Sequence, residues 1–260
     1  MKILFIGDVF AKPGRKAVED LLPVLICRHL PDLVIANIEN AAHGSGISAQ
    51  TLDFFNSQEI DVYTTGNHVL EKPDALELLN NEPKLIRPAN YPPGFPGRGY
   101  AVFETRKRVK VAVVNLQGTV FMPRIECPFR TMDRILNEIG SSTNLIFVDF
   151  HAEATSEKRA LGYYLDGRVS AVIGTHTHVQ TADEEILPKG TAFLSDAGMT
   201  GPHHSIIGMK KEIILEKFLS RLPQKFEPAA KGNILCGVLV ELDERNGRGI
   251  GILRIRERLD

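Results

Sequence analysis

The sequence predicts an α/β protein built on a largely parallel sheet. Two features indicate this class: short β-branched, apolar runs recur along the first two thirds of the chain, and amphipathic segments separate them. A third feature concerns function, because the ends of successive predicted strands carry polar side chains. In α/β sheets such positions converge at one edge, where ligands commonly bind.

The expected elements alternate in the order typical of β-α units. We expect strands at residues 2–7, 32–38, 61–65, 100–104, 109–115, 144–149, 169–173 and 191–194, and a closing hairpin of 234–242 with 249–255. Helices are expected at 13–30, 48–56, 74–79, 130–139 and 210–219, with Pro13 in the first turn of one and Ser48 as the N-cap of another. The Pro- and Gly-rich segment 87–99 is interpreted as a connection inside a single domain, residues 1–260.

Composition excludes several classes of protein. The chain has 260 residues, 43% of them hydrophobic, and a formal net charge of -1, so no global charge favours nucleic acid or membrane. The basic run 106–108 has no interleaved aromatic residues and is interpreted as a hairpin tip. Three dispersed cysteines predict reduced packing residues rather than disulfides or a zinc ribbon. Without a leader-like or membrane-spanning apolar run, a cytoplasmic location is expected.

Five predicted strand exits carry oxygen or imidazole ligands. Singly, each is weak, because an Asp after a strand is often only an N-cap and a lone His is usually solvated or packed. The pair His176 and His178 is stronger, since two imidazoles in one tight loop can face the same cation or two adjacent ones. Together the exits predict a dinuclear site with nitrogen and oxygen donors. The exits are Gly7-Asp8, Glu39-Asn40, Gly66-Asn67-His68, His151 and Gly174-Thr175-His176-Thr177-His178.

The order of these groups resembles the calcineurin-like metallophosphoesterases. The whole chain is similar to their YmdB-like bacterial branch, through the motifs IGDVF, IENAAHGSGI, TTGNHVLEK, FHAEATSEK, IGTHTHVQTAD and DAGMTGPHHSIIG. The resemblance implies a four-layer αββα sandwich holding two metal ions. It also implies a metal-dependent phosphodiesterase acting on cyclic nucleotides, notably 2′,3′-cyclic nucleoside monophosphates.

Two departures from the wider superfamily point to the same branch. Phe10 stands where the superfamily's D-x-H motif has a histidine, and Glu39 replaces the bridging Asp. The YmdB-like branch shares both changes, and the resemblance implies that Asn40 takes the place of the missing histidine ligand.

Carried over by this resemblance, seven residues form two ligand sets that share Glu39. One set comprises Asp8, Glu39, Asn40 and His178, and the other comprises Glu39, Asn67, His151 and His176. The two carboxylates leave a positive excess on two divalent cations, which would attract a phosphate and activate a bridging water for attack. Iron or manganese is expected, with zinc as the alternative.

His68 is the candidate catalytic residue, because a leaving oxygen needs a proton donor. Its alternative role is to orient Asn67. The roles of four further residues stay open between site and surface or turn positions: His43, Asp196, His203 and His204.

The expected partner is a small-molecule phosphate ester. Neither a membrane nor stable nucleic-acid binding is expected, and the oligomeric state, a homo-oligomer included, stays open. The competing functions are a phosphomonoesterase or another phosphodiesterase on the same metals, and a regulatory protein that binds a nucleotide without hydrolysing it.

Overall fold

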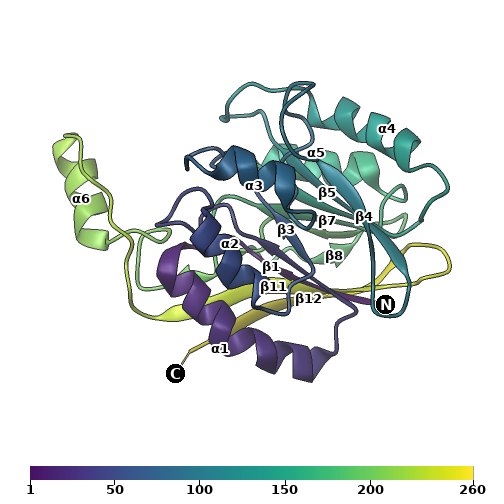
Figure 1. Cartoon of the computed structure of the whole chain (residues 1–260), viewed down its shortest axis with the longest axis horizontal. Coiled ribbons are helices and arrows are strands. Elements are labelled where there is room, and N and C mark those ends of the chain that lie inside the picture. Colours follow the sequence, from purple (N-terminus) through teal and green to yellow (C-terminus); the bar gives the residue numbers. More distant parts are fainter. Residues whose placement is uncertain (260) are drawn as a thin grey trace.

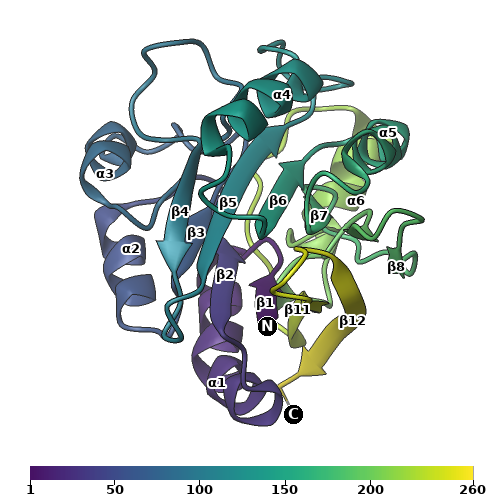
Figure 2. The ribbon, with the colours of Figure 1, turned by 90° about the vertical axis from the view of Figure 1, so that its right-hand side faces the viewer.

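Two β-sheets pack face to face between outer layers of helices in the computed structural model, which describes residues 1–259 (Figure 1). Figure 2 shows the two sheets from the side, with the helices on their outer surfaces. The expected four-layer αββα sandwich is therefore confirmed.

The first sheet has a parallel half and an antiparallel half. Its path is β10-β11-β1-β2-β3, with β12 paired to β11. The parallel strands are β1 (Lys2–Ile6), β2 (Leu33–Asn37) and β3 (Val62–Thr64). The antiparallel strands are β11 (Asn233–Leu242), β12 (Gly249–Arg258) and the short β10 (Gly201–Pro202).

The second sheet follows the order β4-β5-β6-β7-β9-β8. Four central strands run parallel: β5 (Lys110–Gln117), β6 (Ile146–His151), β7 (Ala171–Thr175) and β9 (Ala192–Leu194). Antiparallel strands form the two edges: β4 (Tyr100–Glu104) and β8 (Glu185–Ile186).

Three apolar layers hold the sheets and helices together, because successive strand residues point to opposite faces. In β1, Leu4 faces the helices, whereas Phe5 faces the other sheet and contacts Phe147 with ring centroids 5.3 Å apart. The first sheet is covered by α1 (Ala11–His29), α2 (Ala49–Asn56) and α3 (Ala75–Asn81). The second is covered by α4 (Pro128–Ile139) and α5 (Thr155–Leu165).

One helix lies outside these layers. The helix α6 (Lys211–Ser220) projects from the left of the molecule in Figure 1, away from both sheets. Its only buried residue is Ile214.

Most expected elements are present, and three were missed. Ser48 caps α2 through a reciprocal pair of hydrogen bonds with Thr51, as its position predicted. The missed elements are α5, β8 and β10; α5 follows Ala154, which offers no capping side chain, and the two strands have two residues each. Of the cysteines, only Cys236 is a buried packing residue, so the interpretation of Cys27 and Cys127 as packing residues was wrong. None of the helices in residues 1–259 is both long and apolar enough to cross a membrane.

Arg87 organises the Pro- and Gly-rich segment 87–99. Its guanidinium is buried and donates hydrogen bonds to four backbone carbonyl groups, those of Pro88, Phe95, Pro96 and Gly97. The segment lies outside the helices and strands. The Arg87 side chain therefore donates hydrogen bonds that the backbone of a helix or sheet would otherwise provide.

Replacing Arg87 with Ala should lower the free energy of unfolding by about 1–3 kcal/mol, because four buried or partly buried carbonyl groups lose a donor. Urea unfolding followed by circular dichroism measures the change. Arg98→Ala, at an exposed position of the same segment, is the matched control and should change stability far less. Equal effects of the two substitutions would contradict this role for Arg87.

Candidate metal centre

The seven predicted ligands lie at or just after the carboxyl ends of strands from both sheets. Asp8 follows β1, Glu39 and Asn40 follow β2, and Asn67 follows β3 in the first sheet. In the second sheet His151 ends β6, while His176 and His178 follow β7. Since the two sheets face each other, these ends meet at one edge of the sandwich.

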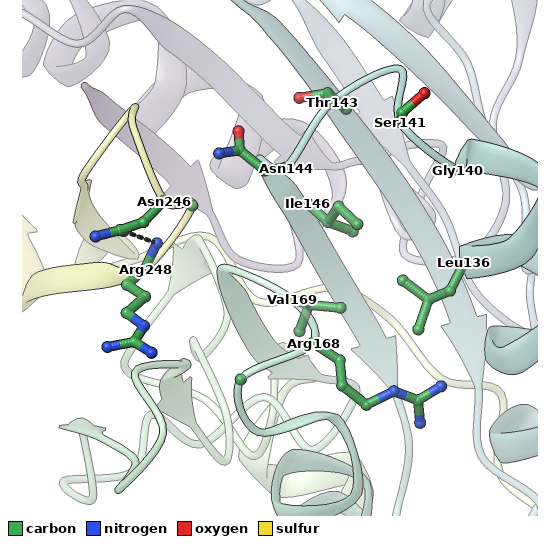
Figure 3. Close-up of a pocket in the computed structure, with 12 residues that line it drawn as sticks. Leu136, Gly140, Ser141, Thr143, Asn144, Ile146, Arg168, Val169, Asn246 and Arg248 are labelled. Atoms are coloured by element: carbon green, nitrogen blue, oxygen red, sulfur yellow. Dashed lines mark hydrogen bonds between the residues drawn. The ribbon is translucent and has the colours of Figure 1, made fainter.

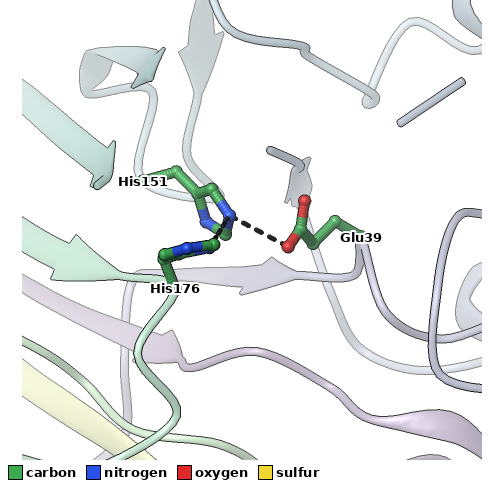
Figure 4. A group of neighbouring side chains, drawn as sticks. All are labelled: Glu39, His151 and His176. Atoms are coloured by element: carbon green, nitrogen blue, oxygen red, sulfur yellow. Dashed lines mark hydrogen bonds and ion pairs between the residues drawn. The ribbon is translucent and has the colours of Figure 1, made fainter. Parts of the chain in front are cut away.

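Glu39, His151 and His176 form the centre of this group (Figure 4). One ligand atom from each lies within 4.8 Å of the other two. The His151 Nε2 atom is 2.9 Å from Glu39 Oε1, 3.0 Å from His176 Nδ1 and 3.0 Å from Asn67 Oδ1. One ring nitrogen can share at most one proton, so it cannot hydrogen-bond to all three acceptors. A cation placed among the four atoms would satisfy them together.

Asn40, His178 and Asp8 adjoin this group. Asn40 Nδ2 lies 3.1 Å from Glu39 Oε1 and 3.2 Å from His178 Nε2; to ligate a cation, the amide would present its oxygen instead. Asp8 accepts a hydrogen bond from the His176 backbone N–H through Oδ2, at 3.0 Å. Its Oδ1 is buried without a hydrogen-bond partner among residues 1–259. A fully buried carboxylate oxygen of this kind is costly unless a cation pairs with it.

The imidazoles of His151, His176 and His178 each direct one ring nitrogen at the cluster. The other ring nitrogen of each lies beside an oxygen atom outside the cluster, called its outer partner. The outer atoms are Thr175 Oγ1 for His151 (2.9 Å), Glu153 Oε2 for His176 (3.2 Å) and the Ile207 carbonyl oxygen for His178 (2.9 Å). Thr175 donates its own proton to Asp149, so it accepts from His151 Nδ1. Such outer partners fix the tautomer of metal-binding histidines and leave the inner lone pair free.

Electrostatics in the cluster favour an ionised Glu39 and a neutral His176. Burial opposes ionisation of Glu39, but the charge of His151 and its hydrogen bond outweigh burial and bring the pKa of Glu39 to about 2. Burial and the nearby charge of His151 lower the pKa of His176 to about 3. Burial also disfavours a charged His151, yet the charge of Glu39 raises the pKa of His151 to about 9. A strong positive charge is thus favoured beside Glu39, and a divalent cation would supply it.

The backbone of the His176–His178 loop adopts strained conformations that direct both imidazole rings at the cluster. His176 has φ 100° and His178 has φ 66°, a region that residues with side chains seldom adopt. Asp196 holds the loop from below: its Oδ2 accepts hydrogen bonds from the Thr177 N–H at 3.1 Å and from the Thr177 hydroxyl at 2.7 Å. Asp196 therefore contacts the loop backbone rather than an imidazole.

Lys158 neutralises Asp196 inside the protein. Its Nζ lies 2.7 Å from Asp196 Oδ2, and both side chains are almost fully buried. Because both charges are removed from water, each depends on the other.

Lys158→Met should lower the free energy of unfolding by about 3–5 kcal/mol, because Asp196 is left as an unpaired buried charge. Adding Asp196→Asn in the same chain should recover part of the loss, since the remaining amide carries no charge. A double-mutant cycle tests this coupling: chemical unfolding is measured for the wild type, both single variants and the double variant. Simple additivity of the two effects would contradict the coupling.

Gly66 is required by the close approach of Glu39 and His151. A Cβ atom at this position would lie 2.3 Å from His151 Cδ2 and 2.4 Å from Glu39 Oε2, far inside contact distance. The glycine of the predicted Gly66-Asn67-His68 motif thus leaves the space in which Glu39 and His151 meet.

Gly66→Ala should therefore separate Glu39 from His151 and sharply reduce the metal content of the purified protein. Elemental analysis by mass spectrometry measures the metal, and circular dichroism checks the fold. Gly251→Ala is the control, because its added Cβ would meet nothing closer than 3.6 Å. Full metal content in Gly66→Ala would show that the observed spacing is not needed.

His68 lies at the rim of the same site. Its backbone N–H donates to Glu39 Oε2 at 3.1 Å, and its Nδ1 lies 2.5 Å from Glu71 Oε1. Its side chain is 35% exposed, so the ring is accessible to a small molecule. Sequence reasoning gave no role to Glu71, to Thr175 and Glu153 beside the imidazoles, or to Asp149, which accepts a hydrogen bond from Thr175. The spacing of Glu71 three residues after His68 was the one available signal.

Three of the open candidates lie elsewhere. His43 is exposed and lines a separate cavity beside the start of α1, together with Lys12 and Lys16. His203 contacts Arg256 with 3.1 Å between His203 Nε2 and Arg256 Nη2, and His204 is exposed. The structure does not place these three histidines among the ligand atoms.

A cavity of about 470 Å³ opens over the cluster and is lined by Glu39, Asn40, His68, His176 and His178. A larger cavity of about 850 Å³ lies at the other end of the second sheet, near the starts of β6 and β7 (Figure 3). Its lining contains no histidine and no carboxylate; Figure 3 shows Asn144, Arg168 and Arg248 around it. The chemistry of the residues therefore assigns the site to the smaller cavity.

Two facing sheets that bring a buried carboxylate and three imidazoles together at their carboxyl edge define a metallophosphoesterase-type protein. The family model described as YmdB-like protein matches residues 4–255. The chain belongs to the YmdB-like family.

Similar proteins agree with this assignment. A Bacillus subtilis (strain 168) protein named 2′,3′-cyclic-nucleotide 2′-phosphodiesterase is 46% identical over 255 residues, covering 98% of this chain and 96% of that protein. A crystal structure of a hypothetical protein from Thermus thermophilus superposes with a TM-score of 0.93 at 42% identity, covering 99% of each chain. A phosphatase structure from Mycoplasma pneumoniae gives a TM-score of 0.93 at 36% identity, covering 99% of this chain and 93% of the other.

Proposed function

We propose that this protein is a metal-dependent phosphodiesterase that hydrolyses cyclic nucleotides, with 2′,3′-cyclic nucleoside monophosphates as its substrates. The observation that carries the proposal is the crowding of Glu39, Asn67 and His176 around the His151 Nε2 atom. The family assignment and the name of the Bacillus subtilis relative support the choice of substrate.

Two ligand sets that share Glu39 would hold two ions. Asp8, Asn40 and His178 would complete one set, and Asn67, His151 and His176 the other. The donors are imidazole, amide and carboxylate without thiolate, which suits iron or manganese, with zinc as the alternative. When bound, such ions activate water as a nucleophile and neutralise charge on phosphoryl oxygens.

The chain's own residues would position the reacting groups. Glu39 carries the buried negative charge that holds the site together, while the outer partners of the three imidazoles keep their lone pairs directed inward. His68, oriented by Glu71, would donate a proton to the leaving ribose oxygen as the diester opens to a monoester.

Metal content and substrate choice can be measured on the same preparation. We expect wild-type protein loaded with iron or manganese to hydrolyse 2′,3′-cyclic nucleotides faster than 3′,5′-cyclic nucleotides and nucleoside monophosphates. Glu39→Gln, which keeps the side-chain size but removes the charge, should lose metal and activity together. Faster hydrolysis of monoesters would instead identify a phosphomonoesterase, and binding without product in loaded protein would identify a regulatory nucleotide-binding protein.

His68→Ala should keep its metal and lose activity by about 100-fold or more, because general-acid groups typically contribute that much. Steady-state kinetics and elemental analysis of one sample test both parts. The matched control is His43→Ala, which removes an exposed imidazole outside the cavity and should leave turnover unchanged. If metal and activity fell in parallel in His68→Ala, the residue would support Asn67 rather than supply a proton.

A further inference from the structure

The cavity above the metal centre has two chemically different ends. One end carries the ligand atoms and His68, as described above. The other end is formed by the segment 206–226, which includes α6, and its lining side chains are apolar except for Lys217. The cavity volume of about 470 Å³ is within the range of small-molecule sites.

Large apolar side chains of this segment are exposed around the cavity. Phe218 is 74% exposed, Ile207 is 54% exposed and Phe226 is 40% exposed, and all three line the cavity. Scattered exposed apolar residues are ordinary, but a group gathered at one cavity is typical of a binding site. Their position, continuous with the ligands His176 and His178, indicates an occupant that also reaches the metal centre.

Neighbouring side chains hold the apolar end of the cavity in place. Lys217 lies over the ring of Phe226 with 4.4 Å between Nζ and the ring centroid, a cation–π contact that helps to hold this ring. Ile214, the buried residue of α6, also lines the cavity and anchors the helix to it. The apolar end thus presents two phenylalanine rings, one of them held by a neighbouring cation.

We propose that this apolar end, with Phe218 and Phe226, is the subsite for the base of the nucleotide. The inference rests on the proposed function, which places the cyclic phosphate at the metal centre. A flat aromatic base stacks on phenylalanine without requiring specific hydrogen bonds. The subsite would therefore accept all four bases and favour purines, whose larger ring system covers more apolar surface.

A second copy of this chain is the competing occupant, because it too could cover Phe218. The continuity of the rings with the metal centre favours the substrate base, since an oligomer contact has no need to reach into the cavity over His176. Sedimentation of each variant at the assay concentration separates the two explanations.

The test compares a substrate with a base and one without. Phe218→Ala and Phe226→Ala are assayed on adenosine 2′,3′-cyclic monophosphate and on methyl riboside 2′,3′-cyclic phosphate, which keeps the sugar and the cyclic diester. We expect KM for the nucleotide to rise about 10-fold, equivalent to about 1.4 kcal/mol, and KM for the baseless diester to stay within about 2-fold. Phe218→Trp should retain nucleotide binding, because indole also stacks.

Leu219→Ala is the control for Phe218→Ala. Leu219 is 82% exposed on the same helix and does not line the cavity, so its removal should change neither KM. Metal content and circular dichroism confirm that each variant is loaded and folded.

The outcomes distinguish this inference from the function on which it rests. If the loaded wild type hydrolysed neither cyclic diester, the proposed function would fail. If it hydrolysed both, and the two phenylalanine variants changed the two KM values equally or not at all, the base subsite would be overturned. A loss of oligomeric mass together with equal losses on both substrates would assign Phe218 to contact between copies of this chain.

Discussion

The contact between Glu39 and His151 is the constraint on which the rest of the site depends. It joins the exits of β2 and β6, one strand from each sheet, through two side chains that are almost fully buried. Glu39 would be costly there without a partner, because it would be an isolated buried charge. The close packing of the two sheets, through contacts such as Phe5 against Phe147, brings the partners to 2.9 Å.

Around this contact, unusual backbone conformations and a close glycine fix the directions in which the side chains point. Gly66 leaves room for both side chains, and the left-handed backbone at His176 and His178 turns two imidazoles inward. Lys158 and Asp196 hold that loop from the core side. Local strain of this kind persists only where surrounding contacts over-determine the conformation, and here those contacts are buried polar ones.

The sequence predicted the polar residues that follow the strands better than it predicted the residues that hydrogen-bond to them and hold them in place. Strand patterns and the polar residues after them are local signals, so Asp8, Glu39, Asn67 and the two histidines of the β7 exit could be recognised without coordinates. Thr175 and Glu153 contact the imidazoles only because distant strands fold together, and neither has a distinctive local pattern. The division into two sheets came from the resemblance to a family, since alternation of strands and helices alone suggested one largely parallel sheet.

The position of α6 outside both sheets has a consequence for how such a protein can diversify. The helix adds one buried residue, Ile214, to the core, so most changes on its surface leave sheet packing intact. Residues at the strand exits have no such freedom, because each is packed against several others at short range. New preferences among phosphate esters could therefore arise by exchanging side chains on one peripheral helix, while the hydrolytic apparatus is inherited unaltered.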